Sequence, residues 1–340
     1  MKEQGGVLVR HYRDLAFMGF VEVLLHLKTI SDNIRFCRKD ILAFSPDTLI
    51  LVDYPGFNLR IARFARSRGI KVFYYISPQL WAWRSSRVKI IKENVDRMFV
   101  ILPFEKAFYA SHGYPVDFVG HPLLDKIHPG MAVDDRATFL GSLSMPDRPL
   151  IALLPGSRRQ EIRKMLRTML GVIPRFPEYQ FVVAGAPSIP PEFYQKVTKF
   201  FPVKVVFGNT YALLRHSVAA LVTSGTATLE TALMDVPQVV VYKGSRLSYL
   251  LARQVVHVRF ISLVNLILDR EVVRELIQDK LTTGNLVAGL KRIMSDESCR
   301  KQINADYNLL REMLGGPGAS AKAAGMMLDQ LKEKEIDTKN

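Results

Sequence analysis

The sequence predicts an α/β protein made of two doubly wound halves, and three observations support this fold class. The chain has 340 residues, of which 48% are hydrophobic and 23% charged, enough for two domains that each bury their own core. Short apolar runs alternate with helical patterns, as in parallel sheets covered on both faces. Turn-forming residues follow these runs, at the edge where open α/β sheets bind ligands.

The formal net charge of +15 predicts an anionic partner, either nucleic acid, a phosphorylated small molecule or a membrane surface. The basic residues are spread over many helices without a recognised binding module, so we exclude nucleic acid. Cys37 and Cys299 have neither disulfide nor metal-ligand spacing, and we predict no metal and no cofactor. The first residues lack the layout of a signal peptide, which favours a cytoplasmic location.

One stretch near the N-terminus is almost entirely apolar. If Leu15 to Leu27 forms a helix, Glu22 and His26 share one narrow line and the remaining surface is apolar. Such a helix is either buried in the core or exposes its apolar face to lipid or acyl chains. In the second interpretation the contacting residues are Phe17, Met18, Phe20, Val21 and Leu24.

The first predicted strand, Thr48 to Val52, ends at Asp53. Because the run is continuously apolar, it is typical of a parallel strand, and Asp53 then lies at a ligand-binding edge. Its carboxylate can act as a general base or can tie down the turn, and the spacing alone does not decide. Asn58 is predicted to cap a helix from Leu59 to Arg68.

Three further strands complete the first half. Lys71 to Ile76 runs into the segment SPQLWAWR, which holds Gln79 and both tryptophans; the two rings either pack in the core or line a groove. The other strands are Arg97 to Leu102 and Val116 to Val119. His121 follows the last strand and is either a strand-end group facing a cleft or a buried structural histidine.

The pattern loosens into Pro, Gly and charged residues from Asp125 to Arg148, which predicts a linker around a short helix, Asp134 to Leu140. We therefore predict a first domain over residues 1–140, a second over 141–315, and a C-terminal helix and tail over 316–340. A helical pattern runs from Glu271 to Leu331. The predicted strands of the second domain are Leu150 to Leu154, Gln180 to Ala184, Val203 to Phe207, Val218 to Val222 and Gln238 to Tyr242.

The turn after the first of these strands reads PGSRRQEI. Gly156 lets a ligand approach the backbone, and Ser157 and Gln160 have the spacing of a capping box. Arg158 and Arg159 lie at the helix start, where positive charge opposes the helix dipole unless an anion sits between them. One of these arginines is therefore predicted to bind phosphate, the alternative being a solvated helix face.

The second domain is organised around the segment TSGTATLETALMD, which follows an apolar strand and opens a helix. Ser224, Gly225 and Thr226 carry little side-chain bulk, so an anion can approach the N–H groups at the helix start. Glu230 lies about one turn beyond Thr226, where its carboxylate can bind a sugar diol. The alternative is an ordinary βαβ unit in which Thr226 caps the helix and Glu230 is solvated.

The chain resembles the lipid-A-disaccharide synthase family in the order and spacing of the segments VDYPGFN, SPQLWAWR, VGHPLLD, LPGSRRQEI, TSGTATLETALMDVPQVVVYK and SLVNL. The resemblance covers essentially the whole chain. It implies a GT-B type fold, in which two Rossmann-like domains face each other across a cleft. It also implies an inverting transferase that joins UDP-2,3-diacylglucosamine to 2,3-diacylglucosamine 1-phosphate, called lipid X, and releases UDP.

The resemblance implies roles for individual residues. Asp53 matches the proposed general base that deprotonates the acceptor 6-hydroxyl, and Arg158 the arginine expected to hold the UDP phosphates. Glu230 matches the glutamate expected to meet the ribose hydroxyls, while Gln79 and His121 match positions near the cleft without an assigned role. The UDP-sugar site implied in this way consists of Gly156, Ser157, Arg158, Ser224, Gly225, Thr226, Glu230 and Asn265.

The resemblance also implies partners and a location. Both substrates carry acyl chains, which favours lipid contact for the Leu15 to Leu27 segment and peripheral association with the cytoplasmic face of the inner membrane of a Gram-negative bacterium. A homodimer is a further expected assembly. Arginine and helix-start N–H groups can neutralise the departing UDP, which fits the prediction of no metal.

The chain departs from the family pattern at its start. Members of the family begin with a strand and a turn of the type GEASGD, ahead of the point where this chain opens. We expect either a start site placed too far downstream or a truncated, inactive copy that binds only nucleotide or membrane. Another UDP-sugar enzyme of the same architecture, such as a UDP-N-acetylglucosamine 2-epimerase or a peptidoglycan glycosyltransferase, is the alternative function.

Overall fold

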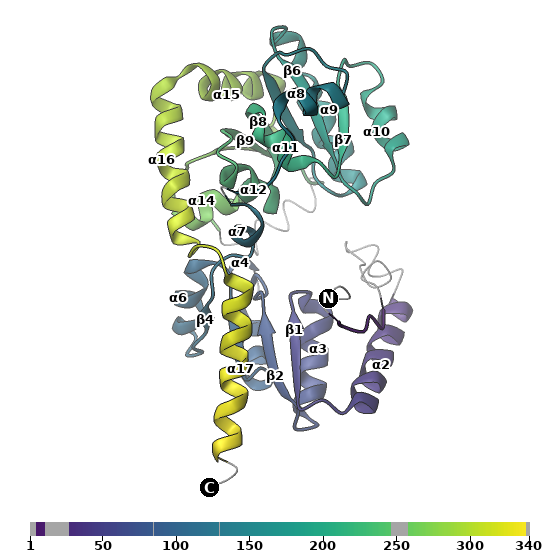
Figure 1. Cartoon of the computed structure of the whole chain (residues 1–340), viewed down its shortest axis with the longest axis vertical. Helices are drawn as coiled ribbons and strands as arrows, with labels where there is room; N and C mark the ends of the chain where they lie inside the picture. Colours follow the sequence, from purple (N-terminus) through teal and green to yellow (C-terminus); the bar gives the residue numbers. More distant parts are fainter. Residues whose placement is uncertain (1–4, 11–26, 84, 129, 246–257, 338–340) are drawn as a thin grey trace. The chain divides into compact units, whose positions relative to one another are not determined.

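The structure, a computed structural model shown in Figure 1, describes residues 5–10, 27–83, 85–128, 130–245 and 258–337. It divides into two compact units, the first formed by Met1–Val100 and Lys106–Asp117, the second by Ile101–Glu105 and Phe118–Asn340. Residues 11–26, which include the predicted acyl contacts Phe17, Met18, Phe20, Val21 and Leu24, lie outside the described residues. Within the described ranges, no helix is both long and apolar enough to cross a membrane.

The first unit contains a four-stranded sheet with the order β1-β2-β3-β4. Its centre is β2, whose residues Val72, Phe73 and Tyr74 are fully buried. The strand pairs β1–β2 and β2–β3 are parallel. The strands are β1 (Thr48–Val52), β2 (Lys71–Tyr75), β3 (Arg97–Val100) and β4 (Asp117–Phe118), and the helices α2 (Leu27–Phe44), α3 (Pro55–Arg66), α4 (Leu80–Trp83), α5 (Val88–Asn94) and α6 (Pro103–Ser111), with a 3₁₀ turn η3 (Ser85–Arg87).

Helix α3 begins earlier than predicted. Pro55, whose ring suits the first helical position, starts the helix, and Tyr54 is the N-cap residue. Asn58 is therefore inside the first turn, and the prediction that it caps the helix is wrong. Its side-chain amide instead donates to the backbone oxygens of Val52, at 3.0 Å, and of Asp53, at 2.7 Å, and so ties the helix to the end of β1.

The second unit contains a six-stranded sheet with the order β10-β9-β8-β5-β6-β7, and every neighbouring pair is parallel. The order reverses between β5 and β8, as in doubly wound nucleotide-binding folds. The strands are β5 (Leu150–Leu154), β6 (Gln180–Gly185), β7 (Lys204–Phe207), β8 (Ser217–Thr223), β9 (Gln238–Tyr242) and β10 (Arg274–Ile277). Two parallel-sheet units confirm the predicted α/β class.

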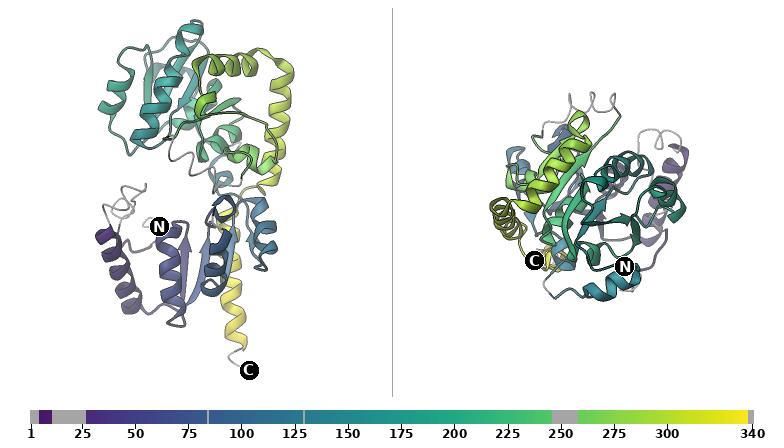
Figure 2. Two further views of the ribbon diagram at one scale, coloured as in Figure 1. Left: turned by 180° about the vertical axis from the view of Figure 1, so that it is seen from behind. Right: turned by 90° about the horizontal axis from the view of Figure 1, so that it is seen from above.

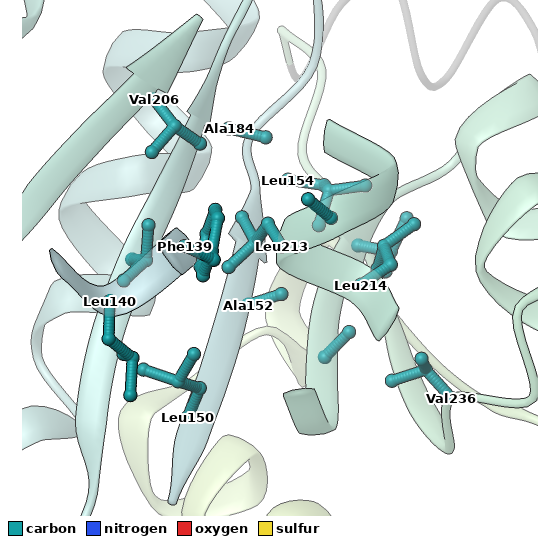
Figure 3. Close-up of a cluster of buried hydrophobic side chains, with 14 residues drawn as sticks. Phe139, Leu140, Leu150, Ala152, Leu154, Ala184, Val206, Leu213, Leu214 and Val236 are labelled. Atoms are coloured by element: carbon teal, nitrogen blue, oxygen red, sulfur yellow. The ribbon is translucent and has the colours of Figure 1, made fainter. Parts of the chain in front are cut away.

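Helices cover both faces of the second sheet. Figure 3 shows the core on one face, where Phe139 of α8 and Leu213 and Leu214 of α11 meet alternate residues of β5. The other face is covered by α9 on β5 and α15 on β8 and β9, with α16 packed against α15, yellow-green in Figures 1 and 2. The helices are α7 (Leu123–Lys126), α8 (Arg136–Ser142), α9 (Arg159–Leu170), α10 (Pro191–Thr198), α11 (Thr210–Arg215), α12 (Thr226–Leu233), α14 (Leu263–Leu268), α15 (Thr283–Ser295), α16 (Glu297–Met313) and α17 (Ala319–Asp337), with 3₁₀ turns η4 (Ile173–Arg175) and η5 (Gln278–Lys280).

Two local predictions for the second unit are corrected. The helical run predicted from Glu271 starts instead with strand β10, because these residues pair with the edge of β9. The N-cap residue of α9 is Arg158, and no capping hydrogen bond from a side chain is formed there, so the capping box predicted for Ser157 and Gln160 is wrong.

Candidate functional site

The reversal of strand order in the second unit places two loops at one edge of the sheet. Strands β5 and β8 are direct neighbours, with Leu154 opposite Val222. The chain leaves β5 towards β6 and leaves β8 towards β9, which lie on opposite sides, so right-handed crossovers send α9 and α12 to opposite faces. The loops before these helices border the crevice where doubly wound sheets bind ligands. Gly156, Ser157, Ser224 and Gly225 belong to these two loops, and Thr226 is the first residue of α12.

Glycines in these loops bring bare backbone to the edge of the sheet. Gly156 has φ 101°, and a Cβ there would lie 3.1 Å from Glu161 Oε2 and 3.5 Å from Thr223 Cγ2. Gly225 has φ 156°, which L side chains rarely adopt, and nothing lies within 4 Å of an added Cβ. The first glycine is needed for close packing of the two loops, and the second leaves open space before α12.

The start of α12 is not capped by a side chain. Its N-cap residue is Gly225, and Ser224 donates its hydroxyl hydrogen to Ile261 O at 2.7 Å. Thr228 turns back within the first turn, its hydroxyl donating to Gly225 O at 2.8 Å. The N–H of Thr228 donates to Gly225 O at 3.1 Å, and no side chain among the described residues caps the N–H groups at the helix start, an arrangement that suits an anion.

Glu230 is held by a residue that the sequence analysis did not identify. Tyr211 of α11 donates its hydroxyl hydrogen to Glu230 Oε1 at 2.6 Å. The ammonium group of Lys126 lies 4.9 Å from the centre of the Tyr211 ring. Burial, together with the hydrogen bond to Glu230 and its charge, raises the pKa of Tyr211. No sequence pattern links Tyr211 to Glu230, which lies 19 residues further along the chain.

Arg158 is paired within its own helix start. Its Nη1 atom donates to Glu161 Oε1 at 3.0 Å, and the arginine side chain is 57% exposed. The carboxylate of Glu161 thus supplies the negative charge that the arginines were expected to require. Arg159 lies with its guanidinium 5.9 Å from the ring of Phe193, a residue of the neighbouring helix α10. Of the two arginines, Arg158 is the one at the loop beside β8.

Asn265 is fully buried and all its hydrogen-bonding capacity is used. Its Nδ2 donates to Val273 O at 2.7 Å and to Glu275 Oε1 at 2.9 Å, and its Oδ1 accepts from the N–H groups of Val272 and Val273. Glu275 also accepts from the N–H groups of the loop before α14, at Ile261 and Ser262. Asn265 is therefore placed to hold this loop, the same loop whose Ile261 accepts from Ser224.

In the first unit, the ends of β1 and β2 have left-handed backbone at residues other than glycine. Asp53 has φ 47° and Tyr54 φ 46° after β1, and Ile76 has φ 64° after β2. The Asp53 carbonyl accepts from Tyr74 Oη at 2.6 Å and from Asn58 Nδ2, while its side chain is exposed. For a β-branched residue such as Ile76 this conformation is a marked outlier, and such strain concentrates at functional sites.

The other two predicted cleft residues differ in exposure. Gln79 is exposed and immediately precedes α4. His121 is only 3% exposed. Its ring atom Nδ1 accepts from the backbone N–H of Leu123 at 3.2 Å, and the backbone N–H of His121 donates to Leu314 O at 3.0 Å. Burial lowers the pKa of His121 to about 4. These contacts match the structural interpretation of this histidine.

At the carboxyl edge of the second sheet, two buried polar atoms have no hydrogen-bond partner among the residues that the structure describes. They are Thr223 Oγ1, at the end of β8, and Gln278 Nε2, directly after β10. Gln278 is 8% exposed and has φ 52°, so an unsatisfied donor and a strained backbone coincide there. The strand that positions Gln278 was hidden by the helical pattern of its neighbours.

The described part of the chain has no cluster of three or more histidine, cysteine, aspartate or glutamate side chains arranged to hold a metal ion. Positive charge at the two loops comes from Arg158, the N-cap residue of α9, and from the partial charge at the start of α12. Any anion bound at this edge can thus be neutralised by groups of the chain itself.

A family model described as lipid-A-disaccharide synthetase matches residues 1–328. The lipid-A-disaccharide synthase of Geobacter sulfurreducens is 39% identical and aligns over 97% of this chain and 87% of its own length. That of Syntrophus aciditrophicus is 40% identical over 98% of this chain and 89% of its own length. That of Trichlorobacter lovleyi is 38% identical, over 98% and 88% respectively.

Solved structures with a similar fold are far more distant in sequence. The S. aureus MnaA-UDP co-structure has a TM-score of 0.65 at 13% identity, covering 90% of this chain and 81% of its own. The UDP-GlcNAc 2-epimerase of Neisseria meningitidis bound to UDP-GlcNAc has a TM-score of 0.57 at 14% identity, over 88% and 82%. CalG4, the calicheamicin glycosyltransferase, has a TM-score of 0.56 at 17% identity, over 94% and 83%.

The distant structures agree on the fold, and the near relatives agree on the family. The fold predicted from the sequence, of the GT-B type found in glycosyltransferases, is confirmed by these neighbours. The relatives at 38–40% identity carry one name, and the family model covers all but the last residues of the chain. The chain therefore belongs to the lipid-A-disaccharide synthase family, glycosyltransferases with a role in lipid A biosynthesis.

Proposed function

We propose that this chain catalyses the inverting transfer of a diacylglucosamine unit from UDP-2,3-diacylglucosamine to 2,3-diacylglucosamine 1-phosphate, with release of UDP. The observation that carries the proposal is the pair of glycine loops at the strand reversal of the second sheet, in a member of this family. Bare backbone and an uncapped helix start suit the diphosphate of a sugar nucleotide. Related folds are known in complex with UDP and with UDP-GlcNAc.

We propose that residues of the second unit bind the nucleotide. The N–H groups at the start of α12 and the guanidinium of Arg158 bind the diphosphate, which requires Arg158 to exchange its partner Glu161 for phosphate oxygens. Gly156, Ser157, Ser224, Gly225 and Thr226 form the loops around it. Glu230 accepts hydrogen bonds from the ribose, and Asn265 acts indirectly by holding the loop at Ile261.

Asp53 is proposed as the general base. Its exposed carboxylate takes the proton from the 6-hydroxyl of the acceptor as that oxygen forms a bond to the anomeric carbon of the donor. The bond from the anomeric carbon to the UDP oxygen breaks, and the electron pair leaves with UDP, whose charge Arg158 and the α12 start neutralise. Attack opposite the leaving group inverts the anomeric configuration. Gln79 and His121 are proposed to shape the acceptor side without reacting.

Both substrates carry acyl chains, from which we infer contact with the cytoplasmic surface of the inner membrane. The apolar stretch with Phe17, Met18, Phe20, Val21 and Leu24 is the proposed contact, supported by its sequence pattern alone. The formal charge of +15 favours an anionic membrane surface. A homodimer is proposed as the assembly.

The sequence relationship favours a synthase over a 2-epimerase. The relatives named as synthases are 38–40% identical over nearly the whole chain, whereas the solved epimerase structures at 12–14% identity share the fold. Fold alone does not determine the reaction in such architectures.

The test is formation of the disaccharide 1-phosphate from the two substrates in mixed micelles, followed by mass spectrometry, with UDP release measured in parallel. We expect both products in equal amount, and at least about 100-fold slower formation of both by Asp53→Asn. Folded protein that binds UDP but converts UDP-N-acetylglucosamine to its 2-epimer, and makes no disaccharide, would replace the proposal by the epimerase activity. Folded protein that binds no UDP would overturn the assignment of the glycine loops.

A further inference from the structure

The contact between Tyr211 and Glu230 is not explained by packing alone. Tyr211 is the second residue of α11 and Glu230 the fifth of α12, so two helices that follow different strands meet through one hydrogen bond. The bond joins Tyr211 Oη to Glu230 Oε1 at 2.6 Å, in partly buried surroundings. Hydrogen bonds from a hydroxyl to an ionised acceptor are short and strong, and this length lies within their range.

A glutamate that binds a diol needs such a restraint. Its side chain has three torsions, and ordering it costs about 1–2 kcal/mol in lost rotamer freedom. When one carboxylate oxygen is held by the protein, the position of the other is restricted before the ligand arrives. In Glu230 the held atom is Oε1, and Oε2 has no hydrogen-bond donor in the described part of the chain.

The tyrosine is itself well supported. Its ring packs against the core cluster between α8, α11 and the sheet, beside Ala212 and Leu213. The ammonium group of Lys126 lies 4.9 Å from the ring centre, within the range of a cation–π contact. Because burial and the neighbouring carboxylate raise the pKa of Tyr211, its hydroxyl stays protonated and remains a donor at neutral pH.

We propose that Tyr211 is a positioning residue that fixes Glu230 through Oε1, leaves Oε2 to accept the 2′-hydroxyl of the nucleotide, and so makes the enzyme selective for ribonucleotides over 2′-deoxyribonucleotides. The proposal rests on the proposed function, because it requires a nucleotide at the α12 loop. It adds a specificity determinant on α11, outside the segments that carry the family resemblance.

The test compares the affinity for UDP with that for 2′-deoxy-UDP by titration calorimetry in the wild type, Tyr211→Phe and Glu230→Ala. A hydrogen bond to a charged group predicts that the wild type binds UDP about 10–100-fold more tightly than 2′-deoxy-UDP. Tyr211→Phe keeps the ring and loses the hydroxyl. We expect it to weaken UDP binding several-fold, to leave 2′-deoxy-UDP binding nearly unchanged, and thus to lower the ratio of the two affinities.

Tyr307→Phe is the matched control. Tyr307, on helix α16 of the second unit, is fully buried whereas Tyr211 is half-buried, and the Tyr307 hydroxyl donates to Val236 O at 3.2 Å. Tyr307→Phe removes a hydroxyl that donates a hydrogen bond, as Tyr211→Phe does. We expect the ratio of the affinities for UDP and 2′-deoxy-UDP to stay at the wild-type value in this control. A merely structural role of Tyr211 would make Tyr211→Phe behave like this control.

A double variant locates the effect. If Tyr211 acts through Glu230, adding Tyr211→Phe to Glu230→Ala changes the ratio no further, whereas independent action would lower it again. An unchanged ratio in Tyr211→Phe, with a lowered ratio in Glu230→Ala, would overturn the role of Tyr211 while leaving the nucleotide site in place. A wild type that binds no UDP would overturn the proposed function and this inference together.

Discussion

The candidate sites at the carboxyl edges of the two sheets differ in which residues have unusual backbone angles. In the two loops at the strand reversal of the second unit these residues are glycines, Gly156 and Gly225, and the space before α12 is open, whereas Gln278, further along that edge after β10, is left-handed with a side chain. In the first unit the strand ends carry left-handed Asp53, Tyr54 and Ile76, all with side chains. One edge offers bare N–H groups, and the other holds side chains in a strained turn.

This difference in backbone conformation indicates which chemistry each edge can support. Backbone N–H groups suit a large anion that is bound but not transformed, because they are rigid and cannot exchange protons with it at neutral pH. A side chain held in a sparsely populated conformation suits a group that must be aimed, at a cost of about 1–3 kcal/mol per residue. This difference supports the proposal that the second unit binds the nucleotide and that Asp53 of the first unit transfers the proton.

The largest expected effect is the loss of the base. Asp53→Asn keeps the size and tolerates the left-handed conformation, so we expect an unchanged fold and UDP affinity, with turnover about 10²–10⁴-fold lower. Asp47→Asn, before the other end of β1, is the matched control and should retain full turnover. Steady-state kinetics in mixed micelles measure both. Turnover of Asp53→Asn equal to that of the wild type would remove Asp53 as the base and, with it, half of the comparison.

The second prediction tests whether His121, a residue that follows a strand, is buried and neutral in the folded protein. His121 is held neutral, with a pKa of about 4 against an ordinary value of 6.5. The unfolded chain therefore binds one more proton between these values, and the free energy of unfolding falls as the pH drops from 6.5 to 4, by about 3 kcal/mol in all. Urea unfolding across this range measures the loss. His121→Asn, which retains an acceptor for Leu123 N, should flatten the profile.

The control for that measurement is His112→Asn, which removes an exposed histidine and should keep the wild-type slope, since His121 is still present. A wild-type profile without this slope would show that His121 is protonated in the folded protein and is not sealed from solvent.

Much of this architecture could be predicted because the signals are local. The apolar run Thr48–Val52 was predicted with the bounds that the structure has, and Gly156 and Gly225 were found from the turns that interrupt apolar and helical patterns. Strand β10 was missed, because Arg274–Ile277 is short and charged and becomes a strand only by pairing with β9. Its own residues carry no alternating pattern.

The side-chain partners could not be predicted, since they depend on how strands are ordered. Tyr211 meets Glu230 because α11 and α12 both pack near β8. Asn58 had the composition of a cap, yet the helix began at Pro55 and the amide was used to hold β1. The left-handed angle of Ile76 has no sequence signal, because β-branched residues avoid this conformation.

The third prediction concerns the bare edge. Gly225→Ala places a methyl group where nothing lies within 4 Å, so any damage comes from the backbone, whose φ of 156° an alanine rarely adopts. We expect the loop to shift and the UDP affinity to fall about 10-fold, as for the loss of one charge-assisted hydrogen bond. Gly69→Ala is the control: its φ is 72°, its surroundings are equally open, and it follows α3 in the first unit. That variant should lose stability but retain UDP affinity.

The prediction with the smallest expected change in stability tests the backbone strain at Asp53 directly. Asp53→Gly removes the side chain from a left-handed residue, and we expect the free energy of unfolding to rise by about 1 kcal/mol while turnover is lost. The same substitution at Asp47, whose φ is not positive, should lower stability by about 0.5–1 kcal/mol, because glycine gains only freedom in the unfolded chain. Urea unfolding of both variants gives the two signs. If Asp53→Gly were destabilised as much as Asp47→Gly, the turn after β1 would store no strain, and the two edges would differ in chemistry but not in the conformational energy that maintains it.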